Sequence, residues 1–95
     1  MDATQRTSNP MTLEEMDEVI KQRLKQLGMR IAYIRKRRGL NQDQLAEQTG
    51  YSLSYLAKIE ANSGDEPHTP SLGCLFRIAF VLDIPIESLL VDDIK

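Results

Sequence analysis

Residues 40–62, LNQDQLAEQTGYSLSYLAKIEAN, form the stretch that decides the fold of this 95-residue chain. Asn41 can cap a helix start, with Gln44 three residues later as the second half of a capping box. Ala46 is small enough to let another helix approach closely. Gly50 stands where the helix must end and the chain must turn, a place that favours glycine because the backbone φ angle is positive there. The stretch therefore begins with a short helix that stops at a tight turn.

A second helix follows the turn and has one apolar side. Ser52 can cap it, and Leu56 and Ile59, three residues apart, form a stripe that can be buried. Two short helices that cross at a tight turn make a helix-turn-helix, whose second helix can read the major groove of DNA. The side chains predicted to read bases are Leu53, Ser54, Tyr55 and Lys58. For Tyr55 the alternative is a ring that leans into the core and offers only its hydroxyl to phosphate.

The charge pattern favours nucleic acid despite an acidic total. The chain has 12 lysines and arginines against 14 aspartates and glutamates, for a net charge of −2. Residues 28–59 nevertheless carry six basic and two acidic side chains, whereas residues 60–95 carry two and seven. The side chains predicted to hold the DNA backbone are Arg37, Arg38, Asn41 and Gln42. A merely solvated basic helix end is the simpler alternative, and we favour phosphate contact because the basic run adjoins the helix-turn-helix.

Features outside the central stretch carry a resemblance to a known family. They are LGMRIAYIR at residues 27–35, TPSLGCLFRIAFVL at residues 69–82 and IESLL at residues 86–90. Together with the central stretch they make the chain resemble the Cro/C1-type, or XRE-type, helix-turn-helix family of bacterial and phage regulators over residues 27–91. Several spaced features that agree in order are more specific than one short motif.

The resemblance implies a fold, a function and a structural ion pair. The fold would be an all-α, five-helix, lambda-repressor-like DNA-binding domain, to which the residues ahead of the resemblance would add an extra N-terminal helix or helix extension. The function would be sequence-specific binding of double-stranded DNA by a homodimer that regulates transcription from a near-palindromic operator. Family members often pair an arginine near the end of the first helix with a glutamate near the end of the recognition helix, and Arg35 and Glu60 stand in those positions. A bidentate bond there would fix the reading helix to the scaffold.

The chain is predicted to hold one domain with additions at both ends. The predicted parts are a disordered tail at residues 1–11, an N-terminal helix or extension at residues 12–26, the helix-turn-helix domain at residues 27–91 and a C-terminal tail at residues 92–95. No apolar run approaches the ~20 residues needed to span a bilayer, and the polar start has no signal-peptide core, so a cytoplasmic protein without a membrane partner is expected. The single cysteine, Cys74, fits a reducing compartment and is predicted to be a small buried hydrophobe.

One apolar stripe runs through the first helical region. Thr12 and Glu15 form a capping box at its start. The stripe has spacings of three and four residues and consists of Leu13, Met16, Ile20, Leu24, Leu27, Ile31 and Ile34. Gly28 could mark a bend between two helices, or one helix could run from Leu13 to Arg38, because glycine inside a helix costs only about 1 kcal/mol.

The helix predicted at residues 70–82 is more apolar than one buried face requires. Thr69 would cap it and Pro70 would be its first residue. Its expected core stripe is Leu72, Leu75, Ile78, Ala79 and Leu82, which leaves an aromatic patch on another side. Either the N-terminal helix or the same surface of a second copy could cover this patch, and we favour the second copy. The predicted dimer contact comprises Phe76, Phe80, Ile86, Leu90, Val91 and Ile94.

Other functions are either unsupported or remain alternatives. The sequence has no catalytic set of side chains, no phosphate-binding loop and no metal-ligand spacing, so we expect no enzyme activity, cofactor or metal. The loop at residues 63–68 carries Asp65 and Glu66, which would repel phosphate, and its lone His68 is interpreted as an ordinary loop residue. The alternatives are an antitoxin of a toxin–antitoxin pair and an interaction adaptor that has lost DNA binding. A protein partner, such as a toxin or an antirepressor, would then bind the apolar fourth helix or one end of the chain.

Overall fold

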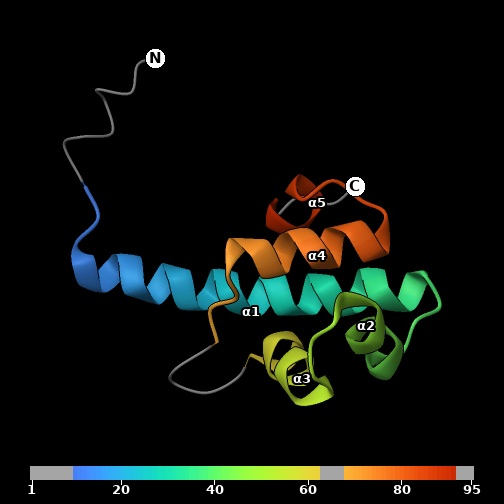
Figure 1. Ribbon diagram of the computed structural model, residues 1–95. Helices are drawn as coiled ribbons and strands as arrows, with labels where there is room; N and C mark the ends of the chain where they lie inside the picture. Colours follow the sequence, from blue (N-terminus) through green and yellow to red (C-terminus); the bar gives the residue numbers. More distant parts are fainter. Residues whose placement is uncertain (1–9, 63–67, 92–95) are drawn as a thin grey trace.

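The structure is a computed structural model that describes residues 10–62 and 68–91. These residues form five helices: α1 (Leu13–Arg37), α2 (Gln42–Thr49), α3 (Leu53–Ala61), α4 (Leu72–Leu82) and α5 (Glu87–Leu90). Neither described stretch contains a strand, so the predicted all-α fold is confirmed there. Figure 1 shows α1 crossing the molecule, with α2 and α3 on one side of it in this view and α4 and α5 on the other.

The first helix is continuous. It is 25 residues long and passes through Gly28 without a break. It begins at a capping box in which the Thr12 hydroxyl accepts from the Glu15 backbone N–H at 3.0 Å and the Glu15 carboxylate accepts from the Thr12 N–H at 2.9 Å. Its C-cap is Arg38, after which Gly39 takes a positive φ of 75°. The sequence allowed one helix or two in this region, and the structure has one.

A single core joins all five helices. The fully buried apolar side chains are Ile31 of α1, Leu45 of α2, Leu56 and Ile59 of α3, Ile78 and Leu82 of α4, and Leu89 of α5. The helix α1 packs against α3 and α5, whereas α2 packs against α3 and α4. Cys74 is also part of this core, in agreement with its prediction as a small buried hydrophobe.

Only the second half of the α1 stripe lies in the core. Leu27 and Ile31 are buried, whereas Leu13, Met16 and Ile20 keep 77%, 42% and 52% of their surface exposed. Figure 1 shows the first turns of α1 extending past the ends of the other helices. The periodicity thus predicts the helix correctly, but it says nothing about which element covers the apolar side.

The fourth helix starts later than the sequence analysis predicts. Ser71, not Thr69, is its N-cap, and the Ser71 Oγ accepts from the Cys74 backbone N–H at 3.0 Å. Pro70 is buried ahead of the helix instead of being its first residue. Leu72 is consequently the first helical residue and is mostly exposed, so its assignment to the core stripe is wrong.

Several predicted features lie wholly or mainly outside the described residues. They are the N-terminal tail at residues 1–9, Asp65 and Glu66 of the acidic loop, and residues 92–95 with Ile94 of the predicted dimer contact. Within residues 10–62 and 68–91, none of the helices combines the length and the apolar character that a bilayer crossing requires.

Candidate DNA interface

The turn between α2 and α3 is built from local backbone chemistry. The Asn41 side chain accepts from the Gln44 N–H and the Gln44 side chain accepts from the Asn41 N–H, both at 2.8 Å, so α2 starts with a reciprocal capping box. Gly50 ends α2 in the left-handed region, with φ at 84°, and its N–H donates to the Ala46 carbonyl at 2.9 Å. Ser52 then caps α3 through a 3.0 Å bond from the Tyr55 N–H to its hydroxyl.

The helix α3 has a buried side and an exposed side. Leu56 and Ile59 are buried beneath it. Of the residues predicted to read bases, Leu53, Ser54 and Lys58 are exposed, whereas Tyr55 is half-buried against the core. The exposed set offers an apolar side chain, a hydroxyl and an ammonium group, which are groups that can contact base edges in a major groove.

Tyr55 is tied to the interior. Its ring lies 5.3 Å from the Tyr51 ring and packs against the core cluster that contains Cys74. Burial, and after it the nearby Cys74 thiol, raise the pKa of Tyr55, and burial likewise raises the pKa of the Cys74 thiol. The Tyr55 ring therefore leans into the core, which is the alternative considered from the sequence.

A charged side chain of α4 holds the turn in place, and the sequence analysis did not find it. The Arg77 Nη1 donates to the Thr49 carbonyl at 3.1 Å, and its guanidinium lies 5.4 Å from the centre of the Tyr51 ring. Both contacts join α4 to the residues beside Gly50. The sequence did contain a signal for this role, because Arg77 is the only charged residue in an apolar helix. A cation next to a core needs a polar or aromatic partner.

The structure brings Arg35 and Glu60 together in a buried ion pair. The Arg35 Nε donates to Glu60 Oε2 at 2.6 Å and its Nη2 donates to Glu60 Oε1 at 2.8 Å, with both side chains less than a tenth exposed. The Arg35 Nη1 donates to the Leu40 carbonyl at 2.8 Å, and the Gln42 Nε2 donates to Glu60 Oε1 at 2.9 Å. The arrangement fixes α3 to the end of α1 and to the start of α2.

The same bond network limits what the predicted backbone-contact residues offer to DNA. The side chains of Asn41 and Gln42 already have partners within the protein, although Asn41 is exposed. Arg37 and Arg38 are exposed at the end of α1. The Arg37 guanidinium lies 5.7 Å from the Tyr33 ring centre, and the Arg38 Nη2 donates to the Asp83 carbonyl at 3.3 Å.

Two further residues position α3, and sequence reasoning missed their roles. A Cβ added at Gly28 would lie 2.3 Å from the Ile59 carbonyl oxygen and 2.6 Å from that of Glu60, so glycine permits the close approach of α1 and α3. Asn62 ends α3 in the left-handed region, with φ at 38°, and its Nδ2 donates to the Leu24 carbonyl at 3.0 Å. An asparagine directly after a helix was a usable signal for such a cap.

Most side chains of the predicted dimer contact are exposed to solvent in the single chain. Phe80 is 73% exposed, Phe76, Leu90 and Val91 are also exposed, and Ile86 is half-buried. The Phe76 and Phe80 rings lie 6.0 Å apart and form the aromatic patch. Phe76 keeps 39% of its surface exposed and Phe80 73%, so the N-terminal half of α1 does not enclose them in the single chain.

Solved structures with the same arrangement are helix-turn-helix proteins. A crystal structure of the biofilm master regulator SinR in complex with DNA matches with a TM-score of 0.61 and 37% identity, covering 68% of this chain and 98% of that chain. The SinR–SinI complex matches equally well, with 38% identity over 67% of this chain and 59% of that chain. The restriction-modification controller protein C.AhdI from Aeromonas hydrophila has a TM-score of 0.61 and 30% identity, covering 70% and 94%. The fold is that of a helix-turn-helix DNA-binding domain.

Sequence comparison gives the family. The profile described as Helix-turn-helix matches residues 31–89. The transcriptional regulator SinR of Bacillus subtilis is 38% identical over 64 residues, which are 67% of this chain and 55% of SinR. The immunity repressor of Bacillus phage phi105 is 40% identical over 67 residues, or 70% of this chain and 44% of that protein. The chain belongs to the Cro/C1-type helix-turn-helix family, and it spans about half the length of these two relatives.

Proposed function

We propose that this protein is a cytoplasmic, sequence-specific DNA-binding regulator of transcription that acts as a homodimer on a near-palindromic operator. The observation that carries the proposal is the exposed side of α3, where Leu53, Ser54 and Lys58 are accessible above a buried apolar stripe. In a helix-turn-helix, the first residues of the second helix contact base edges. The relatives support this class, because SinR and the phi105 protein are named as a regulator and a repressor and SinR has been solved with DNA.

The proposed roles follow the geometry of the interface. Leu53, Ser54 and Lys58 read bases, and Arg37 and Arg38 contact phosphate from the end of α1. The start of α2, with Asn41 and Gln42, is proposed as a further backbone contact because the amino end of a helix favours anions. Tyr55 is proposed to anchor α3 to the core rather than to read bases, since its ring is half-buried against the core cluster.

Measured DNA affinity tests these roles. A binding site would first be selected from random duplexes and then used in fluorescence anisotropy across a salt titration. Lys58→Ala should cost about 1–3 kcal/mol and relax preference at one base pair, whereas Arg38→Ala should weaken all sequences about equally and reduce the salt slope by about 1. Lys25→Ala on α1, which also removes one exposed positive charge, is the matched control. Unchanged affinity and base preference in Lys58→Ala would exclude base reading by this side of α3.

The dimer contact is proposed on the patch of Phe76 and Phe80, continued by Ile86, Leu90 and Val91. A fully buried aromatic or aliphatic side chain contributes about 1.5–3 kcal/mol relative to exposure, so two copies of this patch can hold a dimer. The exposed acidic side chains Asp83 and Glu87 lie near its edge and repel their equivalents across a two-fold axis. Salt should therefore tighten the dimer while it weakens DNA binding.

Sedimentation at low micromolar concentration tests the dimer. Phe80→Glu should give a folded monomer with weak binding to a single half-site, because it places a charge in the centre of the patch. Phe80→Leu, which keeps an apolar side chain, is the control and should remain dimeric. If the Phe80→Glu protein remained a dimer, the dimer interface would have to lie on another surface than α4.

A second candidate function is binding of a protein partner, such as a toxin or an antirepressor. It is favoured by the extent of exposed apolar surface on α4 and by the complex of the relative SinR with the SinI protein. The same DNA measurements separate an adaptor from a regulator. An adaptor that has lost DNA binding would show no salt-dependent affinity for any duplex.

A further inference from the structure

The first half of α1 carries an apolar stripe that the rest of the described chain leaves uncovered. We infer that residues 13–24, here called the α1 arm, pair antiparallel with the same segment of a second copy. Leu13, Met16 and Ile20 follow one side of the helix at spacings of three and four residues and are all exposed. The family match begins at residue 31, so the arm lies ahead of the residues that the family profile matches.

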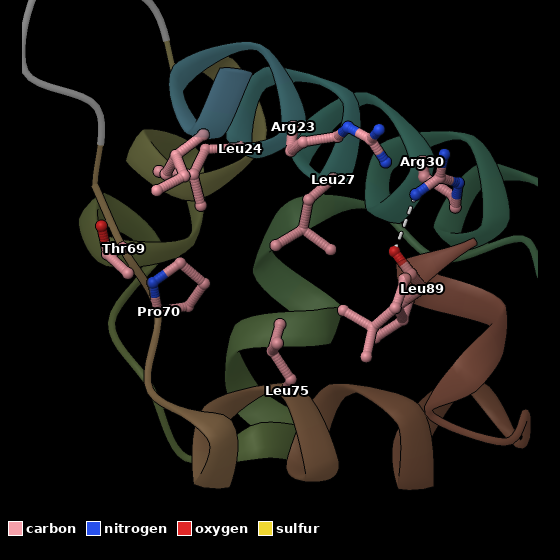
Figure 2. A pocket seen from close by; sticks show the side chains of 10 residues that line it. Arg23, Leu24, Leu27, Arg30, Thr69, Pro70, Leu75 and Leu89 are labelled. Carbon is pink, nitrogen blue, oxygen red and sulfur yellow. Dashed lines mark hydrogen bonds between the residues drawn. The ribbon is translucent and has the colours of Figure 1, made fainter. Parts of the chain in front are cut away.

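The exposed stripe continues into an apolar pocket. The pocket has a volume of about 270 Å³ and is lined mainly by Ile20, Leu24 and Leu27 of α1, Pro70 ahead of α4, and Leu89 and Leu90 of α5. Figure 2 shows Leu24, Leu27, Pro70 and Leu89 arranged around one open space. Stripe and pocket therefore form one continuous apolar surface, which is the kind of surface that another apolar helix covers.

The charges along the arm select both the occupant and its orientation. The first two turns carry Glu14, Glu15, Asp17 and Glu18, and the turns that follow carry Lys21, Arg23 and Lys25. A parallel pair of arms would set acidic turns beside acidic turns. An antiparallel pair sets the acidic turns of each copy beside the basic turns of the other, so the segment is complementary to itself, as a two-fold contact requires.

A two-fold axis at the height of residue 19 along the helix, with the apolar stripe facing the second copy, satisfies the charges and the apolar side chains together. Asp17 and Lys21 lie one turn apart along the same edge of the stripe and equally far from Val19. Across the axis each Asp17 then faces Lys21 of the second copy. Met16 and Ile20 pack beside the axis, and Leu13 reaches toward the pocket of the second copy.

The chain segments outside the structure fit this surface less well. Residues 1–9 are MDATQRTSN, with Met1 as the only large apolar side chain, residues 63–67 are SGDEP, with none, and residues 92–95 are DDIK. The arm contact itself is short, since 12 helical residues span about 18 Å. It is therefore a weak contact, which matters most at high protein concentration or between dimers held side by side on DNA.

Exchange of the paired charges tests the antiparallel pairing. Self-association of the whole chain is measured by sedimentation equilibrium over a wide concentration range. The Phe80→Glu background removes the α4 patch from the measurement. Asp17→Lys and Lys21→Asp should each weaken the remaining self-association about tenfold, because each replaces two attractive pairs with two repulsive ones. The double exchange should restore it to about the starting value. Glu18→Lys makes the same charge change on the opposite side of the helix and should have little effect.

Disulfide formation tests the register independently. Ile20→Cys should form a disulfide-linked dimer at least about tenfold faster than Leu13→Cys, seven residues away along the same side of the helix, because of these two only residue 20 lies close enough to the axis to meet its own equivalent in the antiparallel pair. The native Cys74 is buried and does not interfere. Equal cross-linking at both positions would indicate a parallel pair and would overturn the proposal. Absence of both the charge-dependent association and the Ile20→Cys cross-link would overturn it as well.

Discussion

The two halves of α1 share one pattern of apolar residues and have different surroundings. In the second half, Leu27 and Ile31 are buried in the core shared with α3 and α5. In the first half, Leu13 and Ile20 repeat the same spacing and are exposed. The comparison shows that periodicity establishes an apolar side on a helix, whereas burial depends on a second element that periodicity does not identify.

Polar contacts fix the second half of α1 to the neighbouring helices. The Arg30 Nη1 donates to the Leu89 carbonyl at 2.8 Å, which ties α1 to α5. Arg35 forms its buried pair with Glu60, and the carbonyl of Leu24, at the boundary between the halves, accepts from Asn62. Arg30 and Arg35 are thus structural, although the sequence places them in the basic stretch that adjoins the candidate DNA interface.

The largest effect is expected when the ion pair of the second half is broken. Glu60→Ala leaves the Arg35 guanidinium buried without its carboxylate and takes an acceptor from Gln42, which should cost about 3–5 kcal/mol of unfolding free energy. Urea unfolding followed by circular dichroism measures the loss. Glu47→Ala, on the exposed side of α2, is the control and should stay within about 0.5 kcal/mol. A fully stable Glu60→Ala protein that no longer binds DNA would instead place Glu60 in the recognition chemistry.

The second-largest loss of stability is expected when core volume is removed from the second half of α1. Ile31 is fully buried between helices, and Ile31→Ala should destabilise the protein by about 2–5 kcal/mol through lost burial and a residual cavity. The same urea titration applies, with an unchanged m-value expected if the native fold is kept. A loss below about 1 kcal/mol would mean that α1 packs more loosely than the structure shows.

A smaller but more diagnostic effect is expected at Gly28. In an ordinary helix, glycine to alanine should stabilise by about 1 kcal/mol. Here the added Cβ would meet the backbone oxygens of Ile59 and Glu60, so Gly28→Ala should destabilise by about 1–3 kcal/mol. Gly73→Ala in α4 is the matched control, because its Cβ would meet only the Ser71 Oγ at 3.8 Å and the usual helix gain should appear. Equal stabilisation by both substitutions would contradict the close crossing of α1 and α3.

Local chemistry accounts for what the sequence predicted well. The caps at Asn41 and Ser52 and the turn at Gly50 depend on neighbouring residues alone, and all three are found where expected. The exposed side of α3 followed from the spacing of Leu56 and Ile59, which again needs no distant information.

Contacts between distant segments account for what the sequence missed. Gly28 is required by a helix crossing, and Arg77 by a carbonyl 28 residues away. The start of α4 depended on a choice between Thr69 and Ser71, two hydroxyls with similar capping ability that flank a proline. None of these outcomes follows from a local pattern, because each depends on which surfaces meet in three dimensions.

The smallest effect is expected in the first half of α1, at the position that best matches Ile31. Ile20 belongs to the same stripe and is the same residue type, but it is 52% exposed. Ile20→Ala should therefore change the unfolding free energy of dilute protein by less than about 1 kcal/mol, because little burial is lost and alanine favours the helix more than isoleucine does. At high concentration the same substitution should weaken self-association, since the α1 arm loses an apolar contact beside the proposed axis. A loss at low concentration as large as that of Ile31→Ala would mean that the single chain already covers Ile20, and the difference between the two halves of α1 would then disappear.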